Sequence, residues 1–163
     1  MGVPNLRSAS GCLIAGALAL LLSSCGRTDS PRPYPCKGSV RINGEPAKDA
    51  MVAFYHLDEW GKRTIVPMAW TDDHGDFVLT TYKEGDGAPA GDYEVTITWP
   101  AYHTRRGVGP DRLDGRFADP KKSGLHAHVE AKDNELEPFT IKADVEPVDP
   151  EAATRQPNSR KRN

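Results

Sequence analysis

An alternation of large apolar and polar residues near the middle of the chain sets the strongest constraint on its fold. Four large residues occupy every second position of this stretch, namely Tyr93, Val95, Ile97 and Trp99. Successive side chains of a strand point to opposite faces, so this spacing places all four on one face of a half-buried strand. Phe77 and Leu79 show the same spacing after a turn cluster at 72–75. We predict that both runs pack on one core.

Similar runs along the chain predict an all-β fold, a seven-stranded antiparallel β-sandwich. The runs cover 36–42, 51–57, 65–71, 77–80, 93–99, 125–131 and the stretch that contains Phe139 and Ile141. Asn43-Gly44 is a tight-turn signal because both positions tolerate positive φ. Pro67 marks its strand as an edge strand, since proline cannot donate to a neighbour. The 15 glycines and 14 prolines also favour strands and turns over helices.

The segment 101–124 is a long connection for a compact domain. Loops of this length are usually functional or are held down by their own side chains. Leu113 and Phe117 are the large apolar residues in its second half. We expect them to pin the segment to the core.

The N-terminus has the pattern of an export signal. Arg7 precedes an apolar run of 11 residues, 12–22, far short of the ~20 that a membrane-spanning helix needs. The following Leu22-Ser23-Ser24-Cys25 resembles the lipobox of bacterial lipoproteins. The resemblance implies a signal peptide over 1–24 and lipidation of Cys25, which would hold the protein at a membrane through its acyl chains. The alternative is an ordinary secretory signal with an incidental cysteine.

The next residue, Gly26, is not the aspartate that retains many lipoproteins at the inner membrane, so the resemblance favours the outer membrane. Residues 25–35 are rich in proline and poor in apolar groups, which predicts an extended tether. Residues 144–163 also lack large apolar groups, and we expect a disordered charged tail there. The folded domain is accordingly predicted over 36–143.

Five short motifs within 37–142 resemble the carboxypeptidase-regulatory-like domains, which have a transthyretin-like β-sandwich. They are Gly38-x-Val40, Asn43-Gly44-x-Pro46, Val52, Thr71-Asp72-x-x-Gly75-x-Phe77 and Ala90-Gly91-x-Tyr93-x-Val95. The lipobox together with the stretches 80–93 and 110–125 resembles small bacterial lipoproteins that carry one such domain. That fold includes hydrolases of 5-hydroxyisourate, whose pattern ends in Tyr-Arg-Gly-Ser. This chain ends in Ser-Arg-Lys-Arg-Asn and lacks that motif.

Charge and cysteine content exclude several classes of function. Lysine and arginine (21) nearly balance aspartate and glutamate (23), so no overall field attracts nucleic acid, and no nucleic-acid partner is expected. Of the three cysteines, Cys12 lies in the signal run and Cys25 in the lipobox. Cys36 would then be a single thiol, which we interpret as a small buried residue at the start of a strand rather than a partner in an intermolecular disulfide.

Several residues are candidates for a binding or metal site. The loop 83–90 and nearby aromatic residues could form a binding rim, with Trp60, Tyr82, Lys83, Glu84, Asp86 and Tyr102 as its candidates. His126 and His128 lie two apart on one strand face and could share a metal, but a pair without further ligands is not a motif. Asp72, Asp73 and Asp76 do not follow the EF-hand spacing, so we interpret them as turn residues that bind backbone amides.

The sequence predicts a non-catalytic protein. It has no GxSxG, HExxH, CxxC or phosphate-binding glycine loop. We therefore expect a lipid-anchored envelope protein with a structural or protein-interaction module, without cofactors. A carbohydrate-binding module is the alternative, and a metal-binding protein or hydrolase is the third possibility.

Overall fold

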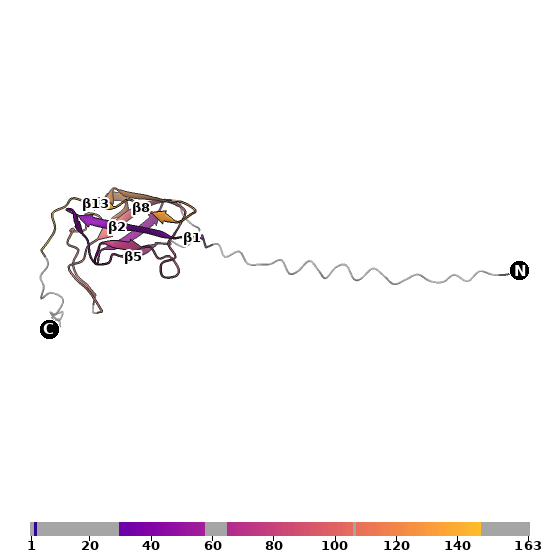
Figure 1. Cartoon of the computed structure of the whole chain (residues 1–163), viewed down its shortest axis with the longest axis horizontal. Helices are drawn as coiled ribbons and strands as arrows, with labels where there is room; N and C mark the ends of the chain where they lie inside the picture. The colour runs from indigo at the N-terminus through magenta and orange to yellow at the C-terminus, as the bar shows by residue number, and fades with distance from the viewer. Residues whose placement is uncertain (1, 3–29, 58–64, 106, 148–163) are drawn as a thin grey trace, which may run out of the picture. The chain divides into compact units, whose positions relative to one another are not determined.

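The computed structural model describes residue 2 and residues 30–57, 65–105 and 107–147. Nearly all regular structure in this part of the chain is β, and the sheets are largely antiparallel, which confirms the predicted fold class (Figure 1). The elements are β1 Pro33–Tyr34, β2 Cys36–Ile42, β3 Glu45–Pro46, β4 Met51–His56, β5 Met68–Trp70, β6 Asp76–Val78, β7 Ala88–Pro89, β8 Gly91–Thr98, β9 His103–Thr104, β10 Gly107–Val108, α1 Pro120–Ser123, β11 Leu125–Val129, β12 Asn134–Glu135 and β13 Phe139–Ile141.

The alternating stretch 93–99 lies in the centre of an antiparallel sheet of four strands, ordered β11-β8-β4-β5. Strand β8 pairs with β4 through Val52–Ile97 and Phe54–Val95, and with β11 through Leu125–Val95. Tyr93, Val95 and Ile97 are fully buried, whereas Trp99 is partly buried against the same core. Strand β5 ends the sheet, as the edge position predicted from Pro67 requires.

The second large sheet is organised around β2, and it contains parallel pairs that the sequence analysis did not anticipate. Strand β2 pairs antiparallel with β3 and β6, but parallel with β12 and β13. The reason is topological. Strands β12 and β13 both come after β11, a strand of the other sheet, so no tight hairpin forces either of them to run against β2. The regular structure is also divided into more and shorter segments than the seven predicted strands.

Side chains from both sheets meet in one core. The Phe54 ring of the first sheet lies 6.5 Å from Phe77 and 6.2 Å from Phe139 of the second, in edge-on arrangements typical of buried aromatic rings. Phe77 and Leu79 are buried, which confirms that their run packs on the same core as 93–99. Cys36 is 1% exposed at the start of β2, as interpreted from the sequence, and burial raises the pKa of its thiol to about 11.

The ordered structure extends beyond both predicted domain boundaries. Pro33–Tyr34, expected in the tether, form β1 and pair with β7. At the other end, the backbone N–H of Glu146 donates to the carbonyl of Arg112 at 2.9 Å, and Val145 packs against the core. The predictions for 1–24, for Cys25, for the loop tip at Trp60 and for most of the charged tail lie outside the described residues.

The segment 101–124 is pinned as predicted. Leu113 is fully buried, and Phe117 packs partly buried against the core. The segment also contains regular structure that was not expected, namely the hairpin β9–β10 and the helix α1. Asp119 caps α1 by accepting the N–H of Lys121, and Gly124 ends it with a left-handed φ of 67°. Among the described residues, no helix is long and apolar enough to cross a bilayer.

A candidate binding groove along β5 and β6

A groove of about 1120 Å³ runs along β5 and β6 and continues over β2 and the β12–β13 connection. It exists because β5 and β6 follow one another in sequence but belong to different sheets, β5 pairing with β4 and β6 with β2. The two runs meet through Met68 and Thr80, whose backbone groups exchange two hydrogen bonds of 3.0 Å, and again at the turn, where the Asp72 N–H donates to the Asp76 carbonyl at 2.8 Å. Trp70 and Val78 lie between these two contacts.

The groove contains exposed apolar side chains. Met68 is 46% exposed, Trp70 36% and Val78 53%, and Leu136 adds a partly buried side chain. These residues point outward from the same strands whose intervening residues, Ala69 and Phe77, are buried in the core. An apolar surface that remains exposed within a concavity is a feature of ligand and protein contact sites.

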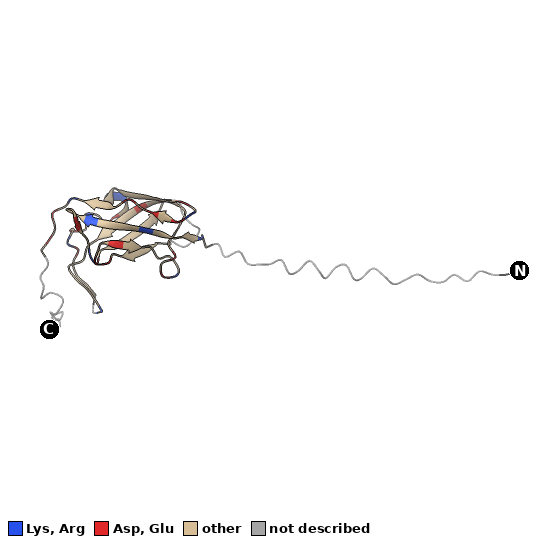
Figure 2. Cartoon of the chain, viewed as in Figure 1, with Lys and Arg blue, Asp and Glu red and all other residues tan. Residues whose placement is uncertain are grey.

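The charged residues of the groove are mainly acidic. Charges of both signs are spread over the β domain as a whole (Figure 2). The groove, however, is lined by five carboxylates and one lysine, a net charge of −4. The lysine, Lys37, lies 3.3 Å from the Glu135 carboxylate. Asp76, Glu84 and Glu137 make no ion pair with any residue in the described part of the chain.

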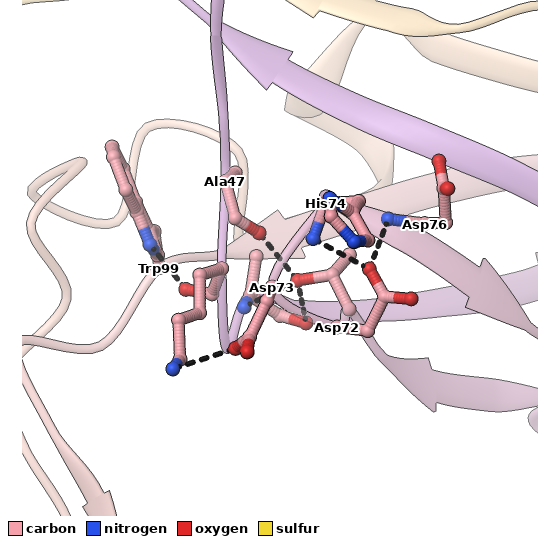
Figure 3. A network of polar contacts seen from close by, with 9 residues as sticks. Ala47, Asp72, Asp73, His74, Asp76 and Trp99 are labelled. Atoms are coloured by element: carbon pink, nitrogen blue, oxygen red, sulfur yellow. Dashed lines mark hydrogen bonds and ion pairs between the residues drawn. The ribbon is translucent and has the colours of Figure 1, made fainter.

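The turn at one end of the groove is held by Asp72, one of the three aspartates predicted to bind backbone amides there. The Asp72 carboxylate accepts the N–H of His74 at 2.8 Å and of Asp76 at 3.0 Å (Figure 3). These two bonds, that of Asp76 first, lower the Asp72 pKa because they stabilise the ionised carboxylate. Gly75 has a φ of 76°, the left-handed conformation expected for this position.

Further polar contacts attach this turn to the rest of the fold (Figure 3). The Lys48 ammonium lies 2.6 Å from the Asp73 carboxylate, and this hydrogen bond and its charge raise the Lys48 pKa. The Trp99 Nε1–H donates to the Lys48 carbonyl at 2.8 Å. The buried Thr71 hydroxyl accepts the Ala50 N–H at 2.8 Å and donates to the Ala47 carbonyl. The acidic end of the groove therefore lies on a well-connected support.

Of the predicted binding-rim residues, the structure brings Glu84 into the groove. Asp86 instead organises its loop, since its carboxylate accepts backbone N–H groups of Thr81, Tyr82 and Lys83. Tyr82 is 46% exposed, and its hydroxyl donates to the Pro31 carbonyl. Tyr102, Tyr82, Lys83 and Asp86 are not among the residues that line the groove. Trp60 lies outside the described residues.

The apolar residues of the groove and two of its three glutamates, Glu135 and Glu137, were not predicted from the sequence. One available signal was the outward position of Met68 and Trp70 on an edge strand, where large apolar residues gain nothing from core packing. No local pattern indicates Glu135 and Glu137. They come close to β6 only because β12 and β6 both pair with β2.

Two exposed or partly exposed tryptophans have ring contacts within the protein. The Trp70 ring stacks on His103 with centroids 4.0 Å apart and planes 14° apart. The guanidinium of Arg112 lies 3.8 Å from the centroid of Trp99, and desolvation lowers the Arg112 pKa from its ordinary high value. Each of these rings therefore has one face covered by a neighbouring side chain.

The two histidines considered for a metal site lie on the outer face of β11, as predicted. His128 Nδ1 is 2.6 Å from an Asp92 carboxylate oxygen on β8, and His126 is paired in register with Glu94. Among residues 30–57, 65–105 and 107–147, no group of three or more histidine, cysteine, aspartate or glutamate side chains is placed to hold a metal ion. The arrangement at His128 is that of a solvent-exposed hydrogen-bonded pair.

Comparisons with known proteins give little further information. No family model and no curated protein matches the sequence. A crystal structure of (S)-allantoin synthase aligns with a TM-score of 0.35 and 16% sequence identity, covering 68% of this chain and 42% of that one. The chain thus spans less than half of that protein, and a likeness at this level gives no basis for transferring an activity.

Proposed function

We propose that this protein is a lipid-anchored cell-envelope protein whose β domain is a non-catalytic protein-interaction module. The observation that carries the proposal is the groove along β5 and β6, in which Trp70 and Val78 expose apolar surface between two strands that diverge into different sheets. The carboxylates around this surface supply polar contacts at its rim. An apolar centre with a polar rim is the common anatomy of a protein interface.

The anchor part of the proposal is supported by the sequence Leu22-Ser23-Ser24-Cys25 after an apolar run of 11 residues. Gly26 after the lipidated cysteine favours the outer membrane. The test is membrane fractionation of the wild-type protein beside Cys25→Ala, both produced with their signal peptide. We expect the wild type in the membrane fraction and the variant in the soluble fraction. An equal distribution of the two would refute the anchor.

The interaction part can be tested by photo-crosslinking in intact cells. A photoreactive amino acid is placed at Val78 in one variant and at Val108 in another. The two positions are matched, because Val78 is 53% and Val108 55% exposed and only the first lies in the groove. We expect discrete crosslinked species from position 78 and none from position 108. The same diffuse products from both positions would refute an interaction through the groove.

A protein partner is favoured over a glycan by the aliphatic side chains that line the groove. Trp70, an aromatic residue that lines the groove, has one ring face stacked on His103. The apolar surface that remains is aliphatic as well as aromatic, with Met68 and Val78 beside it. Aliphatic side chains of this kind fit peptide side chains better than sugar rings, which stack on open aromatic faces.

A further inference from the structure

We infer that the occupant of the groove is an extended, lysine- or arginine-rich peptide segment of a partner protein. The inference rests on the proposed interaction function and names the chemistry of the partner. It is carried by charge complementarity. The groove has five carboxylates and one lysine, whereas the chain as a whole is nearly balanced, so the acidic excess is a local property of this surface.

The positive charge within the groove is already engaged. Lys37 lies 3.3 Å from Glu135, and Asp72 uses its carboxylate to accept two backbone N–H groups of the turn. Three carboxylates remain that form no ion pair with a described residue, those of Asp76, Glu84 and Glu137. Like charges around one groove disfavour each other, and a cationic occupant removes that cost.

The carboxylates come from three separate places around the apolar surface. Asp76 belongs to β6, Glu84 to the loop after it, and Glu137 to the β12–β13 connection. Val78, which is 53% exposed, lies on the same strand as Asp76. Lysine and arginine suit such a surface, because their aliphatic stems cover apolar groups while their charged ends reach the carboxylates. An acidic or neutral peptide would contact only the apolar side chains of the groove and would leave its carboxylates without a partner.

The test uses the full chain in a nonionic detergent and fluorescent nonapeptides of alternating residues. One alternates lysine with valine, one glutamate with valine, and one serine with valine. Fluorescence anisotropy measures binding. We expect the lysine peptide to bind at least about tenfold more tightly than the serine peptide at low salt, and this advantage to fall as salt rises, because exposed charges are screened. Equal binding of the three peptides would overturn the inference.

Variants locate the binding in the groove. Glu84→Gln with Glu137→Gln removes two groove carboxylates, and we expect affinity for the lysine peptide to fall by about tenfold, as for two exposed charge contacts. The matched control, Glu45→Gln with Glu146→Gln, removes the same charge from exposed residues that make no ion pair with a described residue and do not line the groove. Its affinity should stay within about twofold of the wild type. An equal loss in both variants would mean general charge attraction and overturn the inference.

The chain has a basic stretch of its own at 160–162, Arg-Lys-Arg. A full-length variant with these three residues changed to glutamine tests it as an alternative occupant. Peptide binding that appears only in this variant would assign the groove to the chain itself and overturn the inference of a partner. The proposed function is tested separately by the crosslinks from position 78. Discrete crosslinks with no preference for the lysine peptide would support the interaction module and refute the cationic partner.

Discussion

Removal of the Thr71 hydroxyl tests the polar support of the groove. Thr71 is 2% exposed, and its hydroxyl accepts the N–H of Ala50 while donating to the carbonyl of Ala47, both fully buried residues. Thr71→Val keeps the shape of the side chain but removes the hydroxyl. The Ala50 N–H and the Ala47 carbonyl then lose this partner in a place where water does not replace it.

The magnitude follows from these two contacts. A buried backbone group that loses its hydrogen bond costs about 1–3 kcal/mol, and two such groups in the lower part of this range should lower the free energy of unfolding of Thr71→Val by about 2–4 kcal/mol. Thr71→Ser keeps the hydroxyl and removes one buried methyl group, which costs about 1 kcal/mol. The valine variant, although more apolar, should therefore be the less stable of the two.

The assay is urea unfolding followed by tryptophan fluorescence. With an m-value of about 2 kcal/mol/M, the midpoint of Thr71→Val should fall by about 1–2 M urea and that of Thr71→Ser by about 0.5 M. Stability of Thr71→Val equal to or above that of Thr71→Ser would refute the reasoning, because it would mean that burial of the side chain matters and its two hydrogen bonds do not.

Four further substitutions or measurements test other parts of the fold. Leu113→Ala should lower the free energy of unfolding by about 3 kcal/mol in urea titration, because the side chain is fully buried; a loss below 1 kcal/mol would contradict its role as a pin. Gly87→Ala should destabilise more than Gly44→Ala in thermal unfolding: both have φ near 90°, but a Cβ at 87 would lie 1.7 Å from a backbone oxygen of β1, whereas nothing lies within 4 Å at 44. The lowered pKa of Asp72 means that its stabilising effect is full above its ordinary value of 3.8 and is lost as the pH falls through the lowered value. The stability difference between wild type and Asp72→Ala should accordingly shrink in acid, and a difference that grows would contradict the assignment. The Cys36 thiol, with a pKa of about 11, should resist alkylation at pH 8 until the protein unfolds, as mass spectrometry of that residue would reveal.

Part of the candidate site was within reach of the sequence. Asp72 was correctly interpreted as a turn residue, because an aspartate that bonds amides two and four residues ahead is a local device. The same interpretation was wrong for Asp73, whose carboxylate pairs with Lys48, and no backbone amide of the described residues donates to the Asp76 carboxylate. Glu84, a predicted binding-rim residue, lines the groove. Asp86 has the same local chemistry as Asp72. It was predicted as a binding residue, but in the structure its carboxylate accepts backbone N–H groups of its own loop.

The alternation from 93 to 99 and the turn residues determined by themselves that the chain is β-rich and that Tyr93, Val95 and Ile97 are buried, because side-chain direction repeats every two residues whatever the strand pairs with. Thr96, on the opposite face of the same strand, is also buried at 4% exposure, which the alternation did not indicate. Tertiary structure alone decided that β13 runs parallel to β2 and that β5 and β6 diverge into different sheets. The groove is a product of that divergence. Pairing depends on contacts between residues far apart in the chain, as between Lys37 and Glu135, and no local periodicity encodes them.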